Sequence, residues 1–287
     1  MPHQILRHLI KVSTLGALLI LAPLASADER PLNLRIVQSG HSLTDGIMDP
    51  LRRIIRAEGV RGAMIDKSSI PGSGMGYRWD HANPSYRIDA RYKMARYETL
   101  VLTERAPLSG TIPWHDSNGD ALRWFNHAWS VGNDGKGANT IFYATWVNTN
   151  SGPNFENPYN DPDGHITFRE RLPREMAHWD DILEYVNANR PAGSPAMRMI
   201  PGPRLMAAIY DEIAAGRAPG MTNISDLFED TIHLNTLGGY YIALAHFAVI
   251  YERDPRGLQN IDGVTPQQAV WMQDLVWKVL SDEQAAS

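Results

Sequence analysis

Short apolar runs alternate along the chain with segments whose apolar residues recur at helical spacing. A short apolar run between turn residues predicts a buried strand, and apolar positions three to four residues apart predict a helix. Five runs meet the strand criterion: "LNLRIVQSG", "VRGAMIDKSS", "YETLVLTE", "NTIFYATWVN" and "AMRMIPG". The third has an uninterrupted Leu100–Leu102 centre, which is typical of a parallel strand that is buried on both faces.

The segments between these runs have apolar residues at helical spacing. Leu51, Ile54 and Ile55 define a first helix that Gly59 ends, and residues 86–96 form another, with Tyr92, Met94 and Ala95 turned inward. Further helices are expected over 118–131, around 179–186, and over 203–216, 237–250 and 267–280.

Strands that alternate with helices predict an α/β fold, and right-handed crossovers make it a doubly wound three-layer α/β/α structure with a mostly parallel five-stranded sheet. No repeat or interdomain linker interrupts it, so residues 28–287 are expected to form one domain. Ligands in this fold class bind beyond the carboxyl ends of the strands. Ser42, the loop 70–75 and residues 103–105 follow the first three strands, and the loop 149–168 is unusually long.

The first 27 residues have the pattern of a secretory signal peptide. Arg7 and Lys11 precede an apolar stretch over 12–22, and Ala25-Ser26-Ala27 offers a cleavage site. The apolar stretch is shorter than the roughly 20 residues of a membrane span, so we expect export with cleavage near Ala27, to the periplasm or the medium, and no stable membrane span.

The composition and net charge of the chain exclude several classes of function. A net charge of -5 without a long basic run argues against nucleic acid or an anionic membrane as the main partner. The absence of cysteine excludes thiol catalysis and cysteine-ligated zinc. Eight Trp and eleven Tyr suit a core, and they also suit a sugar-binding cleft.

The stretch "SGHSLTDG" places Ser42 in a tight turn directly after the first strand. A serine hydroxyl becomes a nucleophile when a histidine accepts its proton and a carboxylate orients that histidine. Asp230 and His233, in "LFEDTIHLN", have a spacing that lets them meet each other. Taken singly, Ser42 could cap the following helix, Asp230 could be a loop acid and His233 a structural histidine; together they favour a catalytic triad.

The two motifs resemble those of the SGNH (GDSL-like) hydrolase superfamily, whose first block is a Gly-Asp-Ser-Leu-like turn and whose last is Asp-x-x-His. The resemblance implies a flavodoxin-like fold and a metal-free, cofactor-free hydrolase, with Ser42 as nucleophile, His233 as general base and Asp230 as its orienting carboxylate. It also implies an oxyanion hole that the N–H groups of Ser42 and a glycine of "SSIPGSGMG" form, with Gly72 the better match and Gly74 the reserve.

The sequence departs from the family after the third strand. The family asparagine that supplies a third oxyanion donor is missing from "VLTERAPL". Thr103, Arg105 or Asn148 could replace it, or a protonated Glu104 could occupy the pocket there, because an ionised carboxylate cannot donate. His41 stands where the family usually has an aspartate, and its side chain is expected to point away from Ser42.

Two further patterns are interpreted as structural. "NDPDGHI" resembles part of a calcium loop, but Leu172 occupies the position where an EF-hand needs glutamate, so we expect a turn. His127, His178 and His246 lie beside aromatic residues in predicted helices and are expected to be structural or surface residues.

The sequence thus predicts an exported serine esterase that removes a small acyl group, acetyl by preference, from a carbohydrate or a small-molecule ester. The carbohydrate assignment depends on export and on aromatic loop residues such as Trp79, Trp114, Trp146 and Tyr159. A lipase or thioesterase is the enzymatic alternative. A non-catalytic carbohydrate-binding or assembly protein on the same fold is the alternative that the missing asparagine favours.

Overall fold

The computed structural model describes residues 29–286, so the predicted signal peptide lies outside the described residues. Within this range one parallel sheet has the strand order β2-β1-β3-β4-β5. The strands are β1 (Ile36–Gly40), β2 (Ile65–Ser69), β3 (Thr99–Leu102), β4 (Asn139–Ala144) and β5 (Arg198–Pro201). The predicted fold class and the five predicted strands are confirmed.

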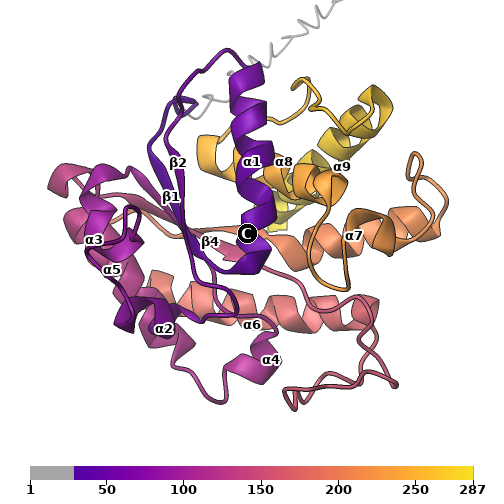
Figure 1. Cartoon of the computed structure of the whole chain (residues 1–287), viewed down its shortest axis with the longest axis horizontal. Helices are drawn as coiled ribbons and strands as arrows, with labels where there is room; N and C mark the ends of the chain where they lie inside the picture. The colour runs from indigo at the N-terminus through magenta and orange to yellow at the C-terminus, as the bar shows by residue number, and fades with distance from the viewer. Residues whose placement is uncertain (1–28, 287) are drawn as a thin grey trace, which may run out of the picture.

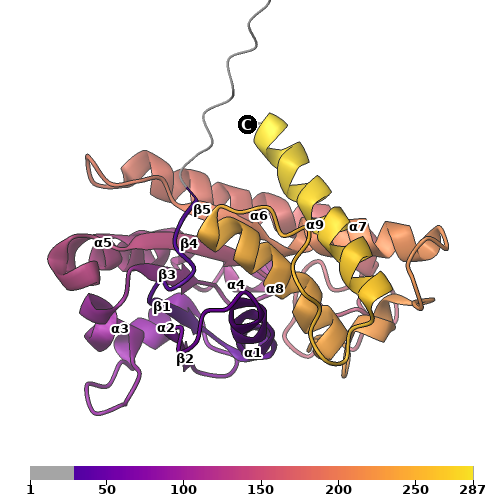
Figure 2. The same cartoon turned by 90° about the horizontal axis from the view of Figure 1, so that it is seen from above.

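Helices cover both faces of the sheet (Figure 1). Figure 2 shows α3 and α5 on one side of the strands and α1 and α8 on the other. The side chains of α7 and α9 join the core on the α1 side, and most of α6 packs with α5. The helices are α1 (Ser42–Ala57), α2 (Met75–Asp80), α3 (Ala90–Lys93), η1 (Met94–Arg96), α4 (Leu108–Thr111), α5 (Ser117–Gly135), α6 (Phe168–Asn189), α7 (Gly202–Ala214), η2 (Ile224–Leu227), α8 (Thr236–Tyr251) and α9 (Pro266–Ala286).

Two helix predictions need correction. The helix expected over 86–96 is limited to the short α3 and η1, and Tyr92 is 48% exposed instead of facing inward. The helix expected around 179–186 extends over 168–189 and includes Pro173 in its interior. No helix within residues 29–286 has the length and apolarity needed to cross a bilayer.

The parallel sheet brings the carboxyl ends of β1, β3 and β4 to one edge, and the backbones of α1 and α8 approach each other closely there. A side chain at Gly239 would place its Cβ 2.7 Å from the carbonyl oxygen of Gly46. Glycine at position 239 therefore allows the start of α8 to pack directly on the start of α1. This contact brings together two segments that are almost two hundred residues apart in the chain.

A buried ionic cluster fixes the long loop 149–168. Arg171 of α6 pairs with Asp161 of the loop and with Glu175 at 3.1 Å. The single hydroxyl of Ser109 lies within hydrogen-bond distance of both carboxylates, at 2.7 and 2.9 Å. Glu175 also accepts the N–H of Leu108 at 2.8 Å. The segment "NDPDG" forms a turn, as predicted, and Asp161 within it serves as an anchor.

We expect Arg171→Leu to lower the free energy of unfolding by about 3–5 kcal/mol, because two buried carboxylates would lose their cation. The matched control is Arg169→Leu, which breaks the exposed pair with Asp211 and should cost less than about 1 kcal/mol. Urea denaturation followed by circular dichroism measures both. Equal losses in the two variants would contradict an anchoring role for the buried cluster.

Candidate active site

Ser42 is the first residue of α1, directly after the last residues of β1. His41 caps this helix, since its Nδ1 accepts the N–H of Leu43 at 3.3 Å. The N–H of Ser42 lies in the first turn, outside the intrahelical ladder, so it is free to donate to a ligand. The capping role considered for Ser42 belongs to His41 instead.

The structure brings Ser42, His233 and Asp230 together. His233 Nε2 lies 3.0 Å from Ser42 Oγ, and His233 Nδ1 lies 2.6 Å from Asp230 Oδ2. The serine and histidine side chains are partly exposed, so the hydroxyl is open to solvent. The arrangement can move a proton from Ser42 to the imidazole while the carboxylate fixes the ring.

The short loop that carries Asp230 and His233 also sets the charge of the carboxylate. Desolvation acts to raise the pKa of Asp230, but hydrogen bonds from the backbone and ring of His233 and from the N–H of Ile232 lower it to about 2. The carboxylate is therefore ionised throughout the neutral range, which favours the tautomer of His233 with its proton on Nδ1.

Three hydrogen bonds from the segment after β4 hold this loop in place. Trp146 Nε1 donates to the carbonyl of Ile232 at 2.9 Å. The backbone N–H and Oγ1 of Thr149 both donate to the carbonyl of Thr231, at 2.7 and 3.0 Å. The position of the imidazole is thus set by backbone contacts and by α8, which begins three residues later.

His41 points away from Ser42, as predicted. Its Nε2 lies 2.9 Å from the carbonyl oxygen of Glu104, so this nitrogen carries the proton and donates. Burial, assisted by the nearby Arg78, lowers the pKa of His41 to about 4. A neutral ring that is held at both nitrogens links the ends of β1 and β3.

The predicted oxyanion loop follows β2. Gly72 has a positive φ of 66° and lies at an exposed turn, whereas Gly74 is buried at the start of α2. A Cβ at Gly74 would lie 2.7 Å from Glu104 Oε1, so only glycine fits there. Among the described residues, no hydrogen bond joins either glycine to Ser42.

Arg78 of α2 holds this loop against the sheet. Its guanidinium donates to the Ser73 carbonyl at 2.7 Å, to Ser39 Oγ at 3.1 Å and to the carbonyl of Thr103. Burial lowers the pKa of Arg78 to about 10, so the side chain stays charged near neutrality. Nothing in "GMGYRWD" distinguishes this buried arginine from an ordinary surface residue, and the sequence analysis missed it.

Glu104 is a structural carboxylate and does not line an open pocket, which corrects the expectation for this residue. It is completely buried and accepts the N–H groups of Met75 and Arg105 at 2.9 and 2.7 Å and the hydroxyl of Ser117 at 3.0 Å. The Thr103 hydroxyl is also buried and faces the carbonyl of Glu104. Arg105 and Asn148, which the sequence also offered for the missing donor, are partly exposed, and both line a small cavity separate from the cleft beside Ser42.

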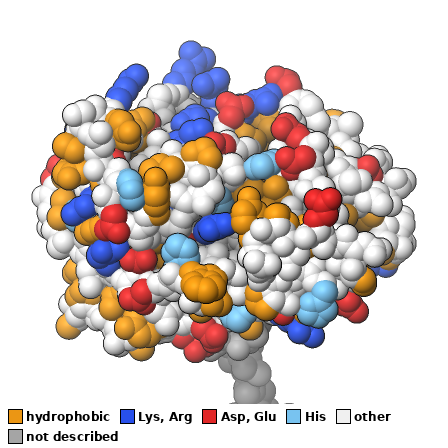
Figure 3. Space-filling model, turned by 60° about the horizontal axis from the view of Figure 1, so that its bottom comes forward, with side chains coloured by type: hydrophobic (Ala, Val, Ile, Leu, Met, Phe, Trp, Pro, Cys, Tyr) orange, Lys and Arg blue, Asp and Glu red, His pale blue; other side chains and the backbone are white. Residues whose placement is uncertain are grey.

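An open cleft of about 410 Å³ adjoins Ser42 and His233. It is lined by Ser42, Leu43, Asp45, Gly46, Glu229, His233 and Leu234. Figure 3 looks onto this end of the molecule, where histidine and basic side chains lie among hydrophobic ones.

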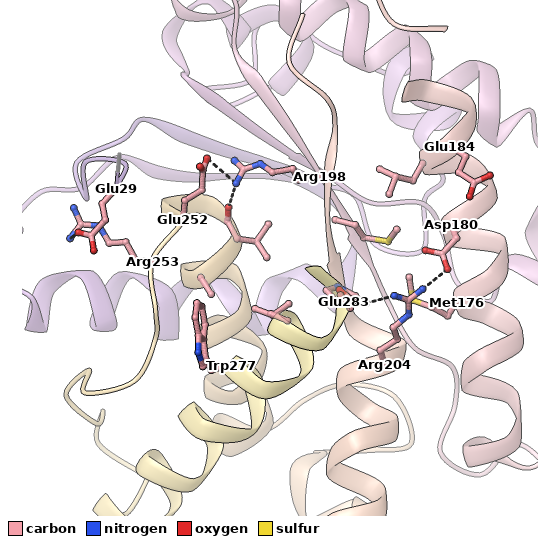
Figure 4. Close-up of a pocket in the computed structure, with 16 residues that line it drawn as sticks. Glu29, Met176, Asp180, Glu184, Arg198, Arg204, Glu252, Arg253, Trp277 and Glu283 are labelled. Carbon is pink, nitrogen blue, oxygen red and sulfur yellow. Dashed lines mark hydrogen bonds and ion pairs between the residues drawn. The ribbon is translucent and has the colours of Figure 1, made fainter. Parts of the chain in front are cut away.

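A larger cavity of about 900 Å³ lies elsewhere, between α6, α8 and α9 at the β5 edge (Figure 4). Its charged side chains pair with one another, as in Arg198–Glu252 at 2.9 Å and Arg204–Asp180 at 2.6 Å. It shares no lining residue with the cleft and holds no candidate triad residue, so its size alone does not make it the reactive site.

The predicted aromatic residues have different environments. Trp146 is fully buried, so it cannot present a face to a sugar, and two arginines lie over the ring of Trp79. Trp114 is 83% exposed and remains available, whereas Tyr159 is 73% exposed and has the Arg105 guanidinium over one face of its ring. The histidines of α5 and α8 are structural, as predicted: His127 contacts Trp79, and His246 is buried.

Comparison with known proteins supports the fold. No family model matches the chain, and no curated protein matches it. A DUF4886 family protein from Bacteroides uniformis ATCC 8492 has a similar crystal structure, with a TM-score of 0.63, 15% identity, and coverage of 86% of this chain and 95% of that one. A protein from Slackia heliotrinireducens described as "a putative SGNH hydrolase" has a TM-score of 0.46 and 18% identity, covering 76% of this chain and 98% of that one. At such identities the first likeness concerns the fold alone.

Two buried histidines predict how stability depends on pH. Burial lowers the pKa of both His41 and His246 to about 4, whereas the unfolded chain binds these protons near 6.5. The unfolded state therefore binds more protons between these values, and the free energy of unfolding should fall as the pH decreases from about 6.5 to 4.

The variant His246→Phe should flatten this dependence, by at most about 1.4 kcal/mol per pH unit, because it removes one of the two groups. Urea denaturation at intervals between pH 7 and 4 gives the slope, and His165→Phe at an exposed position is the control. An unchanged slope in His246→Phe would show that burial does not shift this group.

Proposed function

We propose that the protein is a serine esterase of the SGNH type. The observation that carries this proposal is the continuous chain of hydrogen bonds from Ser42 through His233 to Asp230, with distances of 3.0 and 2.6 Å. The same three side chains form the two sequence motifs that resemble this superfamily. The open position of the serine at the carboxyl edge of the sheet also supports it.

The proposed reaction begins when Ser42 Oγ attacks the ester carbonyl and His233 Nε2 takes the hydroxyl proton. The tetrahedral intermediate collapses as the imidazolium returns this proton to the leaving alkoxide, which gives the acyl-enzyme and the free alcohol. Water then attacks the acyl group by the same route and regenerates the serine. Asp230 stays ionised and stabilises the imidazolium in both halves.

The developing oxyanion needs donors that are already in place. The N–H of Ser42 at the start of α1 is one, and the partial positive charge of the helix terminus strengthens it. We assign the second donor to the loop after β2, with Gly72 as the first choice and Gly74 as the reserve. Arg78 would act as a positioning residue for this loop through its bonds to Ser73 and Ser39.

We further propose that the substrate is a small acyl ester, acetyl by preference, on a carbohydrate. Exposed Trp114 and the face of Tyr159 that Arg105 leaves open offer flat surfaces of the kind that sugars bind. The signal-peptide pattern of residues 1–27 supports export to the compartment where such polymers occur.

The purified mature protein should hydrolyse 4-nitrophenyl acetate and be inactivated by a serine-directed organophosphate. Ser42→Ala and His233→Ala should each lower kcat by about 10⁴-fold or more, because the triad acts as a unit. Both variants should keep the melting temperature near that of the parent, since His41 provides the helix cap. Release of 4-nitrophenolate and calorimetry measure the two effects.

Folded protein without turnover and without labelling would instead favour a binding function. A large loss of stability in Ser42→Ala would indicate that the hydroxyl supports the fold. Thr44→Ala serves as the control for a nearby structural hydroxyl, because its Oγ1 donates to the His41 carbonyl at 2.6 Å.

A further inference from the structure

The backbone of Arg105 lies near that of Ser42, the proposed nucleophile. β3 runs parallel to β1, and the bond of 2.9 Å from the His41 ring to the Glu104 carbonyl holds the two chains together past their last paired residues. Arg105 and Ser42 each come one residue after this link. Since neighbouring strands lie about 4.8 Å apart, a side chain as long as arginine can reach the space around the ester.

The guanidinium of Arg105 is not used by the fold. Within the described part of the chain, the guanidinium forms no ion pair and donates no hydrogen bond; only the backbone N–H of Arg105 donates, to Glu104. Its carbon lies 5.3 Å from the centre of the Tyr159 ring, so the loop 149–168 orients it by a cation–π contact. A partly exposed arginine that an aromatic ring orients is well suited to bind an anionic group.

Asn148 supplies a second group of donors to the same small cavity. The Thr231 hydroxyl donates to Asn148 Oδ1 at 3.0 Å, which directs the amide nitrogen away from the triad loop. None of the described residues accepts from this nitrogen, so its two N–H groups are free for a ligand. The bond to Thr231 also links this cavity to the loop that carries Asp230 and His233.

The cavity admits a small polar group. Its volume of about 30 Å³ exceeds the roughly 10–15 Å³ that one water needs. Asp161 also borders the cavity, but Arg171 and Ser109 already bind its carboxylate. A planar group with two oxygens matches both the space and the fork of a guanidinium.

The cleft beside Ser42 differs in charge from the cavity at Arg105. Asp45 and Glu229 line the open cleft beside Ser42, and Lys67 pairs with Asp45 at 3.2 Å. Glu229 is exposed and has no ion-pair partner among residues 29–286. A negative group on a substrate is therefore better accommodated at Arg105 than beside Glu229.

We propose that Arg105 and Asn148 form a subsite for a carboxylate on the ester substrate, so that the enzyme prefers acidic esters such as the acetylated form of a sugar acid. This inference rests on the proposed esterase function. It makes Arg105 a specificity-determining residue that binds a part of the substrate distant from the reacting carbonyl.

A matched pair of esters tests the proposal: 4-acetoxybenzoate and its uncharged methyl ester. The kcat/KM of the parent enzyme for each ester is divided by the rate of alkaline hydrolysis of that ester. The resulting ratio should be about tenfold or more higher for the carboxylate than for the methyl ester. Arg105→Gln should lower kcat/KM for the carboxylate about 10–100-fold, the value of a charge-assisted hydrogen bond, and change the neutral ester by no more than about threefold. Arg105→Lys should retain part of the preference for the carboxylate. Arg174→Gln removes one positive charge at an exposed position of α6 and should leave this preference unchanged.

A binding measurement separates the two proposals, because it does not need turnover. In Ser42→Ala, methyl glucuronoside should bind more tightly than methyl glucoside by saturation-transfer NMR titration, and adding Arg105→Gln should abolish the difference. If neither ester is hydrolysed but this difference is present, the esterase proposal fails and the subsite stands. Equal losses for both esters in Arg105→Gln, or equal binding of both sugars, would overturn the subsite.

Discussion

The close contact between the first turns of α1 and α8 is the constraint on which the site depends. Glycine at position 239 lets the two backbones meet at Gly46, and the serine and histidine come from the residues that flank this contact. The Cβ of an alanine at position 239 would lie 2.7 Å from the carbonyl oxygen of Gly46 and would push α8 outward. Because a proton transfers efficiently only over hydrogen-bond distance, even a small displacement would separate the hydroxyl from the imidazole.

Buried polar groups stabilise the remaining parts of the carboxyl edge. Glu104 and Arg78 both bind the loops that follow β2 and β3. The Arg171 cluster fixes the loop that follows β4. Each group has several partners, which compensates the large cost of placing a charge away from water. The surface that a substrate meets is therefore largely formed before binding, and this arrangement limits the entropy lost when a ligand is bound.

The sequence predicted the fold and the meeting of Ser42, His233 and Asp230 because both leave strong local signals. Strand and helix periods follow from which side chains must be buried, and the triad residues lie in two short motifs at expected places in the topology. Tyr92 was misplaced because the Tyr86–Arg96 pattern was too short to specify a helix face, and tertiary contacts decided its exposure. Glu104 and Arg78 could not be assigned, because their roles come from contacts between loops far apart in sequence. Trp146 was expected in a surface loop, but it lies buried directly after β4. Its indole N–H donates to Ile232, in the loop that carries Asp230 and His233.

The hydrogen bond between Ser42 and His233 spans 191 residues of the chain. Contacts of such high sequence separation close large loops, whose entropic cost is met only after most of the structure has formed. A ribosome-bound or truncated chain that ends before His233 therefore has a serine without its proposed base, however well its sheet is formed. The proposed catalytic arrangement is in this way completed late in folding, and under that proposal reactivity toward an organophosphate reports completion of the native topology more strictly than helix content does.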